Sequence, residues 1–386
     1  MNFNMVPFSY HNPTAIEFGW GSLVRLPELV KSVGGRRPLV VADPGVAKAG
    51  LVDRVVASLG GSVPVAIFTD VESDPDARSV DAGVRLARSS ESDVIIGIGG
   101  GSAMDVAKVI GVMLTNPGNI RDYNGMGKIG KPGAPVIAIP TTSGTGSEMT
   151  IWSVLSDKDK KTKFGVGSVL NCARIALLDP ELTLSLPPAI TAATGIDALT
   201  HALESYVNTA TQPISEAMSE QSMALIARSL RVAVSYPSNK HARSDMLLAS
   251  TIAAMAFNST RLGLAHAFAM PLGSRFHIPH GLANAIMLPV VMRFNLPGNL
   301  AKFARIAQIF GERIEALSLR EAADRSVIAI EQLQVDIGIH QRLRDFGMTE
   351  DDLDDVAAEA IQSGNVAVNP RKPTLEDMKA LLRAKL

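Results

Sequence analysis

The sequence predicts two domains, an α/β domain with a parallel sheet followed by an all-helical domain. Three observations support this prediction. The chain has 386 residues, which is more than one hydrophobic core usually supports, and 46% of them are hydrophobic, as in globular proteins. Short apolar runs alternate with helical patterns as far as Asp179-Pro180. Beyond that point nearly all apolar spacing is helical. We therefore place the domains at residues 1–183 and 184–386.

Five short apolar runs in the first half are expected strands, and a helical pattern follows each of the first four. Strands that alternate with helices in this way form a parallel sheet with right-handed crossovers. The expected strands lie at 14–18, 37–43, 63–68, 93–99 and 136–140. The expected helices lie between about 21 and 33, and at 46–59, 76–89 and 102–114.

The second half begins with a helix-start signal, in which Ser185 precedes Pro187 and Pro188. From there to the end of the chain we expect helices and few strands. The clearest helical periodicities lie at 214–234, 243–260, 300–310, 319–335 and 375–382.

The bulk composition excludes several classes of protein. Lysine and arginine (37) nearly balance aspartate and glutamate (38), so neither a nucleic-acid partner nor an anionic membrane surface is expected. No apolar run reaches the ~20 residues of a membrane span. Cys172 is the only cysteine, which rules out an intrachain disulfide and a thiolate metal site. The first ten residues lack the features of a secretory signal, so we expect a cytoplasmic protein.

Four residues form a candidate metal site. Asp197 and His201 are four residues apart and therefore share one face of a helix. His266 and His280 lie fourteen residues apart, in a segment expected to break at Pro271 and at the glycine and proline that follow it. One carboxylate and three imidazoles would suit a divalent transition metal if they converge.

A glycine-rich turn indicates a nucleotide site of the Rossmann-like kind. Residues 97–102 read Gly-Ile-Gly-Gly-Gly-Ser between an expected strand and an expected helix, although Ser102 replaces the third glycine of the strict fingerprint. A capping box from Ser102 to Asp105 is the structural interpretation of the same segment. A second turn contains Gly144 and Gly146 among hydroxyl side chains. Asp43 ends an earlier strand, where it would bind ribose hydroxyls and favour NAD over NADP or simply begin a turn.

These residues together resemble the iron-containing (group III) alcohol dehydrogenase family. The resemblance spans nearly the whole chain, and its motifs occur in order and at compatible spacing. The matching segments are 99–108 (GGGSxxDxAK), 140–148 (PTTxGTGSE), 179–188 (DPELTxxxPP), 194–202 (TGxDALTHA), 279–285 (PHGxxNA) and 369–371 (NPR).

The resemblance implies a dehydroquinate synthase-like architecture: an N-terminal dinucleotide-binding domain, a helical domain and a metal in the cleft between them. It implies hydride transfer between NAD(H) and an alcohol, aldehyde or ketone, usually in a homodimer or larger assembly. Fe²⁺ is the metal it favours, and Zn²⁺ is possible. Asp197 and His201 would act in catalysis through this metal. The implied metal ligands are Asp197, His201, His266 and His280. The implied cofactor contacts are Asp43, Gly99, Gly100, Gly101, Ser102, Thr141, Thr142, Thr145, Lys163 and Leu182.

The sequence departs from the family pattern near the substrate. The family often has a second histidine four residues after His266, but this chain has Met270, which cannot shuttle a proton. We hypothesise that His277 replaces it as proton relay; an ordinary loop histidine is the alternative. By resemblance Trp152 and Phe257 can face the substrate, with core packing as their alternative role. Arg275 could pair with an anionic substrate group or lie solvated in a loop.

Three other functions would each explain only part of the sequence. A lyase or cyclase of the dehydroquinate synthase type shares the architecture, NAD and the metal, but it would need more basic residues than Lys163 and Arg275. A non-enzymatic NAD-binding protein would not need four intact metal ligands. A zinc hydrolase would not explain two nucleotide-like turns.

Overall fold

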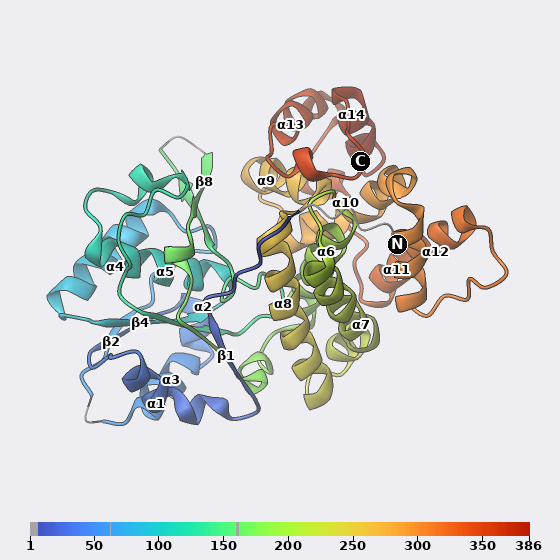
Figure 1. Ribbon diagram of the computed structural model, residues 1–386. Coiled ribbons are helices and arrows are strands. Elements are labelled where there is room, and N and C mark those ends of the chain that lie inside the picture. The colour runs from blue at the N-terminus through green and yellow to red at the C-terminus, as the bar shows by residue number, and fades with distance from the viewer. Residues whose placement is uncertain (1–6, 62, 160–161) are drawn as a thin grey trace. The chain divides into compact units, whose positions relative to one another are not determined.

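The structure is a computed structural model that describes residues 7–61, 63–159 and 162–386. Residues 1–6, which belong to the N-terminal stretch examined above for a signal, lie outside this range. The larger sheet has six strands in the order β1-β9-β6-β4-β2-β3, and every neighbouring pair is parallel. Its strands β1, β2 and β4 are labelled in Figure 1. The parallel α/β fold predicted from the sequence is therefore confirmed. Its strands are β1 (Ala15–Phe18), β2 (Pro38–Val41), β3 (Ala66–Phe68), β4 (Val94–Gly99), β6 (Val136–Pro140) and β9 (Ile175–Leu178).

Helices cover both faces of this sheet. On β2, Leu39 and Val41 pack into the core formed with α4 (Ala77–Ser89) and α5 (Gly101–Thr115), whereas Val40 packs into the core formed with α1 (Leu26–Ser32) and α3 (Leu51–Leu59). The central strands alternate in the same way. Because both faces are buried, the strands read as continuous apolar runs in the sequence.

A second, three-stranded sheet was not expected from the sequence. It consists of β5 (Gly125–Met126), β7 (Trp152–Asp157) and β8 (Thr162–Gly167), in the order β5-β8-β7. β7 and β8 form an antiparallel pair in which Trp152 lies opposite Gly167. The polar residues and glycines of these strands hide the apolar alternation on which strand prediction depends.

The helix expected at 46–59 is two helices, α2 (Pro44–Lys48) and α3. Gly50 separates them with φ of 74°, a left-handed conformation that glycine adopts without steric cost. The other expected helices of the first half exist, with small shifts of their ends. β9 is an additional strand that the sequence analysis did not predict.

After Leu178 the described chain contains helices but no strand. Helix α9 runs through Pro271 and the glycine after it, so the break expected there is wrong; the helix ends at Phe276. His280 begins the next helix instead of lying in a loop. The helices are α6 (Pro188–Val207), α7 (Pro213–Ser235), α8 (Lys240–Thr260), α9 (Leu264–Phe276), α10 (His280–Asn295), α11 (Leu300–Ile309), α12 (Leu319–Asp336), α13 (Leu353–Ala360) and α14 (Leu375–Arg383).

Contacts within the chain divide it into two compact units. The sheet unit contains Pro13–Ala198 and Arg228–Ala254, and the helical unit contains Leu199–Ala227, Met255–Leu386 and, of the described N-terminal residues, 7–12. Helices α6, α7 and α8 each contribute to both units. The domain boundary that the sequence places between 183 and 184 stays a prediction. Among the described helices, none is long and apolar enough to cross a membrane.

Candidate active site

The carboxyl ends of three neighbouring strands carry residues expected to bind a cofactor. Asp43 follows β2, Gly99 ends β4 and Thr141 follows β6. Because these strands are adjacent and parallel, the three positions meet at one edge of the sheet. The backbone amide of Thr141 donates a hydrogen bond to the carbonyl of Gly99 at 2.9 Å. The sheet unit thus brings together the predicted cofactor residues on these three strands.

Two glycines of the turn after β4 leave little or no space for a side chain. Gly99 has φ of 146°, and a Cβ on it would lie 3.1 Å from Oδ2 of Asp43. A Cβ on Gly101 would lie 3.0 Å from the side chain of Thr145. Helix α5 begins at Gly101, and no side chain caps its N-terminus. Its first backbone N–H groups are therefore oriented as in helix N-termini that bind anions.

The same edge offers side-chain groups to a ligand. The hydroxyl of Thr142 is buried and has no hydrogen-bond partner among the described residues. Buried hydroxyl groups are normally paired, so this one fits a ligand bound against the nearby Gly100. Asp43 caps α2 by accepting a hydrogen bond from the amide of Val46 at 3.0 Å. N–H groups for phosphates and a carboxylate for ribose hydroxyls are what a dinucleotide requires.

The second glycine turn packs closely against helices α6 and α8 of the same unit. A Cβ on Gly144 would lie 2.7 Å from the side chain of Thr194 on α6, and a Cβ on Gly146 would lie 2.3 Å from Ala254 on α8. Glu148 is fully buried and accepts a hydrogen bond from the Thr251 hydroxyl at 2.9 Å. Burial raises the pKa of Glu148. Close packing at the two glycines and the hydrogen bond of Glu148 therefore hold this loop in place. The same loop carries Thr141, Thr142 and Thr145.

The capping box expected at Ser102 and Asp105 is not formed. Helix α5 begins one residue before Ser102, so Ser102 lies inside the first turn and cannot be its cap. The Ser102 hydroxyl instead donates to the carbonyl of Ser73 at 2.5 Å. Asp105 faces the loop after β6.

Asp105, which is half-buried, and Lys108 form an ion pair at 3.1 Å. Lys108 is completely buried and donates hydrogen bonds to the carbonyls of Ser147 at 2.9 Å and Trp152 at 2.5 Å. Asp105 accepts from the Ser147 hydroxyl at 2.5 Å and from the amide of Val154 at 2.9 Å. The pair therefore joins α5 to the second glycine turn and to β7.

Helix α6 presents a polar face in a buried position. Asp197 and His201 lie one turn apart on this continuous helix and are 2% and 4% exposed. His266 of α9 stacks on His201 with 4.6 Å between the ring centroids. Asp197, His201 and His266 each offer one ligand atom, and these atoms lie within 4.8 Å of one another. One carboxylate oxygen and two imidazole nitrogens at this spacing fit a divalent transition metal.

His280 lies beside this group of three but is not part of it. Its ring centroid is 5.4 Å from that of His266, and the residue is exposed whereas the other three are buried. Asn284, one turn further along α10, places its amide nitrogen 3.1 Å from Nε2 of His266 and 3.3 Å from Nε2 of His280. The two histidines thus face a common point.

A carboxylate that the sequence analysis missed holds His266. Glu204 of α6 is 2% exposed, and its Oε2 lies 2.7 Å from Nδ1 of His266. It also accepts hydrogen bonds from the backbone amides of Gly263 at 2.8 Å and Ala265 at 2.7 Å. The sequence contains a signal for it, because residues 197, 201 and 204 follow the i, i+4, i+7 spacing of one helix face.

Two family models together match nearly the whole chain. The model described as iron-containing alcohol dehydrogenase matches residues 13–180, and the model described as the C-terminal part of the Fe-containing alcohol dehydrogenase family matches residues 191–386. The chain belongs to the iron-containing alcohol dehydrogenase family. The family expectation from the sequence is confirmed.

Individual relatives agree with the family models. A 1,3-propanediol dehydrogenase of Klebsiella pneumoniae is 41% identical over 99% of both chains. A crystal structure of a 1,3-propanediol oxidoreductase superposes with a TM-score of 0.97 at 40% identity, covering 99% of this chain and 100% of that one. A sulfoacetaldehyde reductase of Bifidobacterium kashiwanohense, solved in complex with NAD⁺, has a TM-score of 0.91 at 31% identity, covering 98% and 99%.

The chain is therefore an NAD-dependent alcohol dehydrogenase of the iron-containing type. The family uses NAD(H) and a divalent metal, mostly Fe²⁺, which agrees with the expected cofactors. The comparisons give no support to the lyase or cyclase alternative.

Two residues that the family resemblance assigned to the cofactor lie on segments other than the ends of β2, β4 and β6. Leu182 follows β9 and is 1% exposed in the core with α1 and α3. Lys163 begins the hairpin strand β8 and forms an ion pair with Asp74 at 2.6 Å. Asp74 belongs to the loop whose Ser73 carbonyl binds Ser102, so Lys163 is linked to the glycine turn indirectly.

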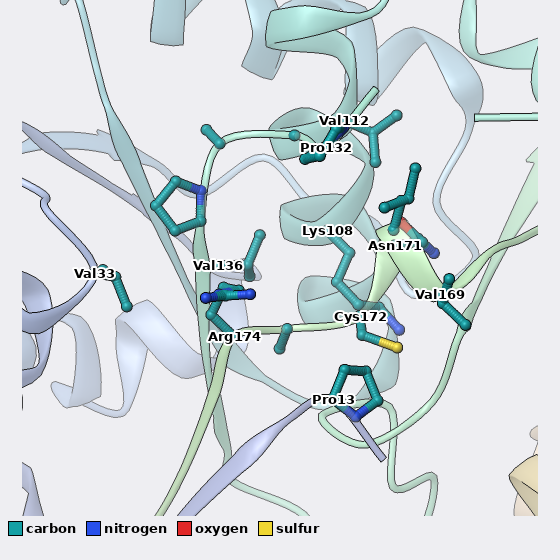
Figure 2. A pocket seen from close by; sticks show the side chains of 15 residues that line it. Pro13, Val33, Lys108, Val112, Pro132, Val136, Val169, Asn171, Cys172 and Arg174 are labelled. Atoms are coloured by element: carbon teal, nitrogen blue, oxygen red, sulfur yellow. The ribbon is translucent and has the colours of Figure 1, made fainter. Parts of the chain in front are cut away.

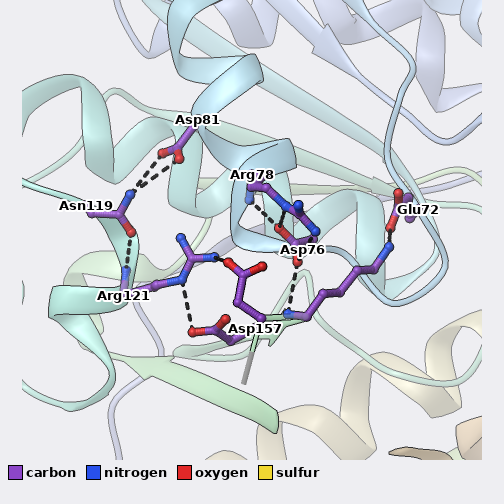
Figure 3. A network of polar contacts seen from close by, with 9 residues as sticks. Glu72, Asp76, Arg78, Asp81, Asn119, Arg121 and Asp157 are labelled. Carbon is purple, nitrogen blue, oxygen red and sulfur yellow. Dashed lines mark hydrogen bonds and ion pairs between the residues drawn. The ribbon is translucent and has the colours of Figure 1, made fainter. Parts of the chain in front are cut away.

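Further polar contacts fasten the β7–β8 hairpin to the loop before α4 (Figure 3). The amide of Lys158 donates to Asp76 at 3.1 Å, and the Lys158 ammonium pairs with Glu72. Burial raises the pKa of Asp76, but hydrogen bonds from Arg78 and from the Arg78 and Lys158 amides outweigh burial and lower it to about 2. Asp76 is therefore ionised at neutral pH and accepts these hydrogen bonds as a carboxylate.

The predicted substrate residues occupy four different environments. Phe257 of α8 lies against the His201 ring, 4.5 Å between centroids. Trp152 lies over Gly165 and Gly167 of β8, where a Cβ on Gly167 would lie 2.5 Å from the indole. Met270 is half-buried on α9. Arg275 lies on α9, not in a loop, and pairs with two acids of α13, Asp355 at 3.2 Å and Glu359 at 3.0 Å.

His277 ends α9 in a left-handed conformation, with φ of 56°. The residue is exposed. Asparagine and histidine are among the few non-glycine residues that tolerate this conformation. The position therefore explains part of the residue choice without any catalytic role.

A cavity of about 330 Å³ lies beside α5 in the sheet unit, lined by Lys108, Asn171 and Cys172 among others (Figure 2). The Lys108 ammonium is already bound by the carbonyls of two residues and by Asp105. Burial raises the pKa of the Cys172 thiol, so little of the reactive thiolate is present. The cavity adds no catalytic group to the site.

Replacing Lys108 by methionine should destabilise the protein by about 1–3 kcal/mol, because it leaves the half-buried Asp105 without its counter-ion and the carbonyls of Ser147 and Trp152 without their donor. The measurement is urea unfolding of Lys108→Met beside Lys128→Met, whose lysine is exposed. A loss below about 1 kcal/mol for Lys108→Met would mean that the pair does not hold the two loops together.

Proposed function

We propose that this enzyme oxidises small alcohols, or reduces the matching aldehydes, on a metal held by Asp197, His201, His266 and His280. The observation that supports this most is the group of three ligand atoms within 4.8 Å, contributed by three buried residues. A bound Fe²⁺ or Zn²⁺ supplies a Lewis acid that lowers the pKa of the alcohol, or stabilises negative charge on a carbonyl oxygen. Both metals accept this ligand set, and Fe²⁺ is our first choice from the family.

We propose that NAD(H) binds at the carboxyl edge of β2, β4 and β6. The backbone N–H groups at Gly100, Gly101 and Ser102 would bind the pyrophosphate. The buried Thr142 hydroxyl would donate to the bound cofactor, with Thr141 and Thr145 beside it on the same loop. Asp43 would accept both hydroxyls of the adenosine ribose and repel a 2′-phosphate. Lys163 and Leu182 are retained from the family resemblance with supporting roles only.

The protein groups around the metal ligands have defined tasks in this proposal. Phe257 packs on the His201 ring and limits how far that ring can turn. Asp197 offsets the charge of the bound metal, and the buried setting excludes water, which strengthens both interactions. Hydride transfer requires the alcohol carbon and the nicotinamide to be bound at once and in contact, which binding converts into an effectively intramolecular reaction.

We propose short aliphatic alcohols as the substrate class, with 1,3-propanediol the first compound to test. The 41% identity to a 1,3-propanediol dehydrogenase over the full chain supports this choice. Trp152, Phe257 and Met270 would supply apolar contact surface. Arg275 is already paired with two carboxylates, which makes an anionic substrate group less favourable at that position.

We further propose a cytoplasmic homodimer or larger homo-oligomer. Strand β1 forms one edge of the six-stranded sheet, and its Ile16 and Phe18 are 38% and 42% exposed. An apolar edge strand is a surface that other chains can pair with or cover, and a second copy would protect it. A cytoplasmic location agrees with the single cysteine.

Removing the metal should abolish turnover and lower the thermal stability of the full chain. A metal that binds only the folded state contributes about 2.7 kcal/mol when its concentration is 100 times Kd. The measurement is NADH formation with a panel of alcohols, hydroxyacids and aldehydes, on protein depleted by chelation and then reloaded separately with Fe²⁺ and Zn²⁺. Full activity of the metal-depleted protein would contradict the proposal. Conversion of the substrate without net formation of NADH would contradict it as well.

Replacing Asp43 by asparagine should shift cofactor preference towards NADP by about tenfold or more, equivalent to ~1.4 kcal/mol. Asparagine keeps the helix cap to Val46 but removes the charge that repels a 2′-phosphate. The measurement is kcat/KM with NAD and NADP, and the exposed Asp53→Asn on α3 is the control. An unchanged ratio would leave Asp43 with its capping role alone.

Replacing His277 by asparagine tests the relay. Asparagine tolerates the left-handed backbone but cannot transfer a proton. If His277 is the relay, turnover should fall by about 10²-fold and its pH profile should flatten. The exposed His340→Asn is the control. Turnover that is unchanged across pH would show that His277 is an ordinary helix-end residue.

A further inference from the structure

Glu204 is a buried carboxylate whose two oxygens are both hydrogen-bonded beside the candidate metal ligands. Its two oxygens accept three hydrogen bonds of 2.7–2.8 Å, from the imidazole of His266 and the backbone amides of Gly263 and Ala265. The side chain is 2% exposed. A buried carboxylate is costly unless its charge is compensated, so this arrangement requires all three donors.

The contact with His266 determines which ring nitrogen carries the hydrogen. An ionised carboxylate only accepts hydrogen bonds, so Nδ1 of His266 must be the donor. In the neutral ring the lone pair then lies on Nε2. Asn284 supports this assignment independently, because its amide nitrogen, a donor, lies 3.1 Å from that same Nε2. Nε2 is thus presented as the ligand atom.

The two backbone contacts fix where the ring is placed. Gly263 precedes α9 and has no side-chain cap, so Glu204 supplies the cap from a different helix. His266 lies in the first turn of the helix that is anchored in this way. A Cβ on Gly263 would lie 2.8 Å from Oε1 of Glu204, although its φ of −142° is open to any residue. Glycine is required here because the carboxylate comes so close.

We propose that Glu204 is a positioning residue of the metal site, which holds His266 in the tautomer and orientation that bind the metal and adds a negative charge behind it. The inference rests on the proposed metal site. Histidine ligands backed by a carboxylate are stronger donors, and loss of such a partner usually lowers metal affinity 10–100-fold. A purely structural cap would lower stability but leave the affinity of the folded protein unchanged.

The test is metal affinity of the full chain, depleted of metal and titrated with Co²⁺ and Zn²⁺ against a competing chelator. Glu204→Gln keeps the size of the side chain but replaces one acceptor oxygen by a donor. We expect its affinity for both ions to fall 10–100-fold and the visible absorption of bound Co²⁺ to change. The matched control is Glu220→Gln, a carboxylate that binds Tyr206 and Arg305 in the same unit.

The outcomes separate this inference from the proposed function. If the unmodified chain binds no metal, the proposed function fails. If the unmodified chain binds metal and Glu204→Gln binds it as tightly with an unchanged Co²⁺ spectrum, Glu204 is only a helix cap and the inference is wrong. If Glu204→Gln does not fold, Glu204→Asp decides: its shorter carboxylate cannot reach all three donors, and wild-type affinity there would equally overturn the inference.

A second test displaces the Glu204 carboxylate by a substitution at a neighbouring residue, with a matched glycine substitution as the control. Gly263→Ala should displace Glu204 and weaken Co²⁺ binding, whereas Gly364→Ala meets only the flexible end of Arg261 and should not. Equal Co²⁺ affinity of folded Gly263→Ala and Gly364→Ala would contradict the positioning role.

Discussion

The candidate metal site depends on how helix α6 accommodates carboxylates in a buried position. Residues 195–207 of this helix are buried on all sides, yet they include Asp197, His201 and Glu204. Transferring such groups from water costs several kcal/mol each unless hydrogen bonds or opposite charge compensate. Glu204 receives three N–H groups from the start of α9, and through them α6 determines where His266 lies. The geometry of the ligands is thus built into the contact between two helices before any metal binds.

The sheet unit solves a similar problem with the opposite charge. Lys108 is completely buried on α5, and its ammonium is compensated by Asp105 and by backbone carbonyls of the loop after β6. The consequence is also similar: the charged group joins segments that are distant in sequence, and the segments it joins carry the cofactor edge. Motif residues that touch no ligand are therefore needed to keep those that do in place.

The sequence was informative where period and spacing determine structure. It predicted the parallel sheet, most helices, the glycine turns and the i, i+4 pair of Asp197 and His201. It failed where tertiary contacts decide. Helix α9 continues through Pro271, which is buried in the helical core. Asp105 accepts a hydrogen bond from the Ser147 hydroxyl instead of taking part in a cap at the start of α5. β7 and β8 lack an apolar alternation. The spacing of residues 197, 201 and 204 places Glu204 on the face of the metal ligands, but its contacts with the start of α9 are tertiary and no sequence pattern displays them.

Different physical constraints act on the residues at the cofactor edge of the sheet and on those around the metal ligands of α6. At the sheet edge the constraint is space: Gly97, Gly99 and Gly101 each leave room that a single Cβ would fill, as at Gly97, where it would lie 2.6 Å from Ala107. Any enlargement there closes the approach of a ligand to backbone N–H groups, whatever its polarity. On α6 the constraint is charge, because Glu204 and its glutamine analogue fill the same volume and differ only in what they can accept. A volume-conserving change such as Glu204→Gln should therefore be harmful on α6, whereas at the sheet edge the harmful changes are those that add volume. Comparing the two kinds of substitution separates steric from electrostatic control.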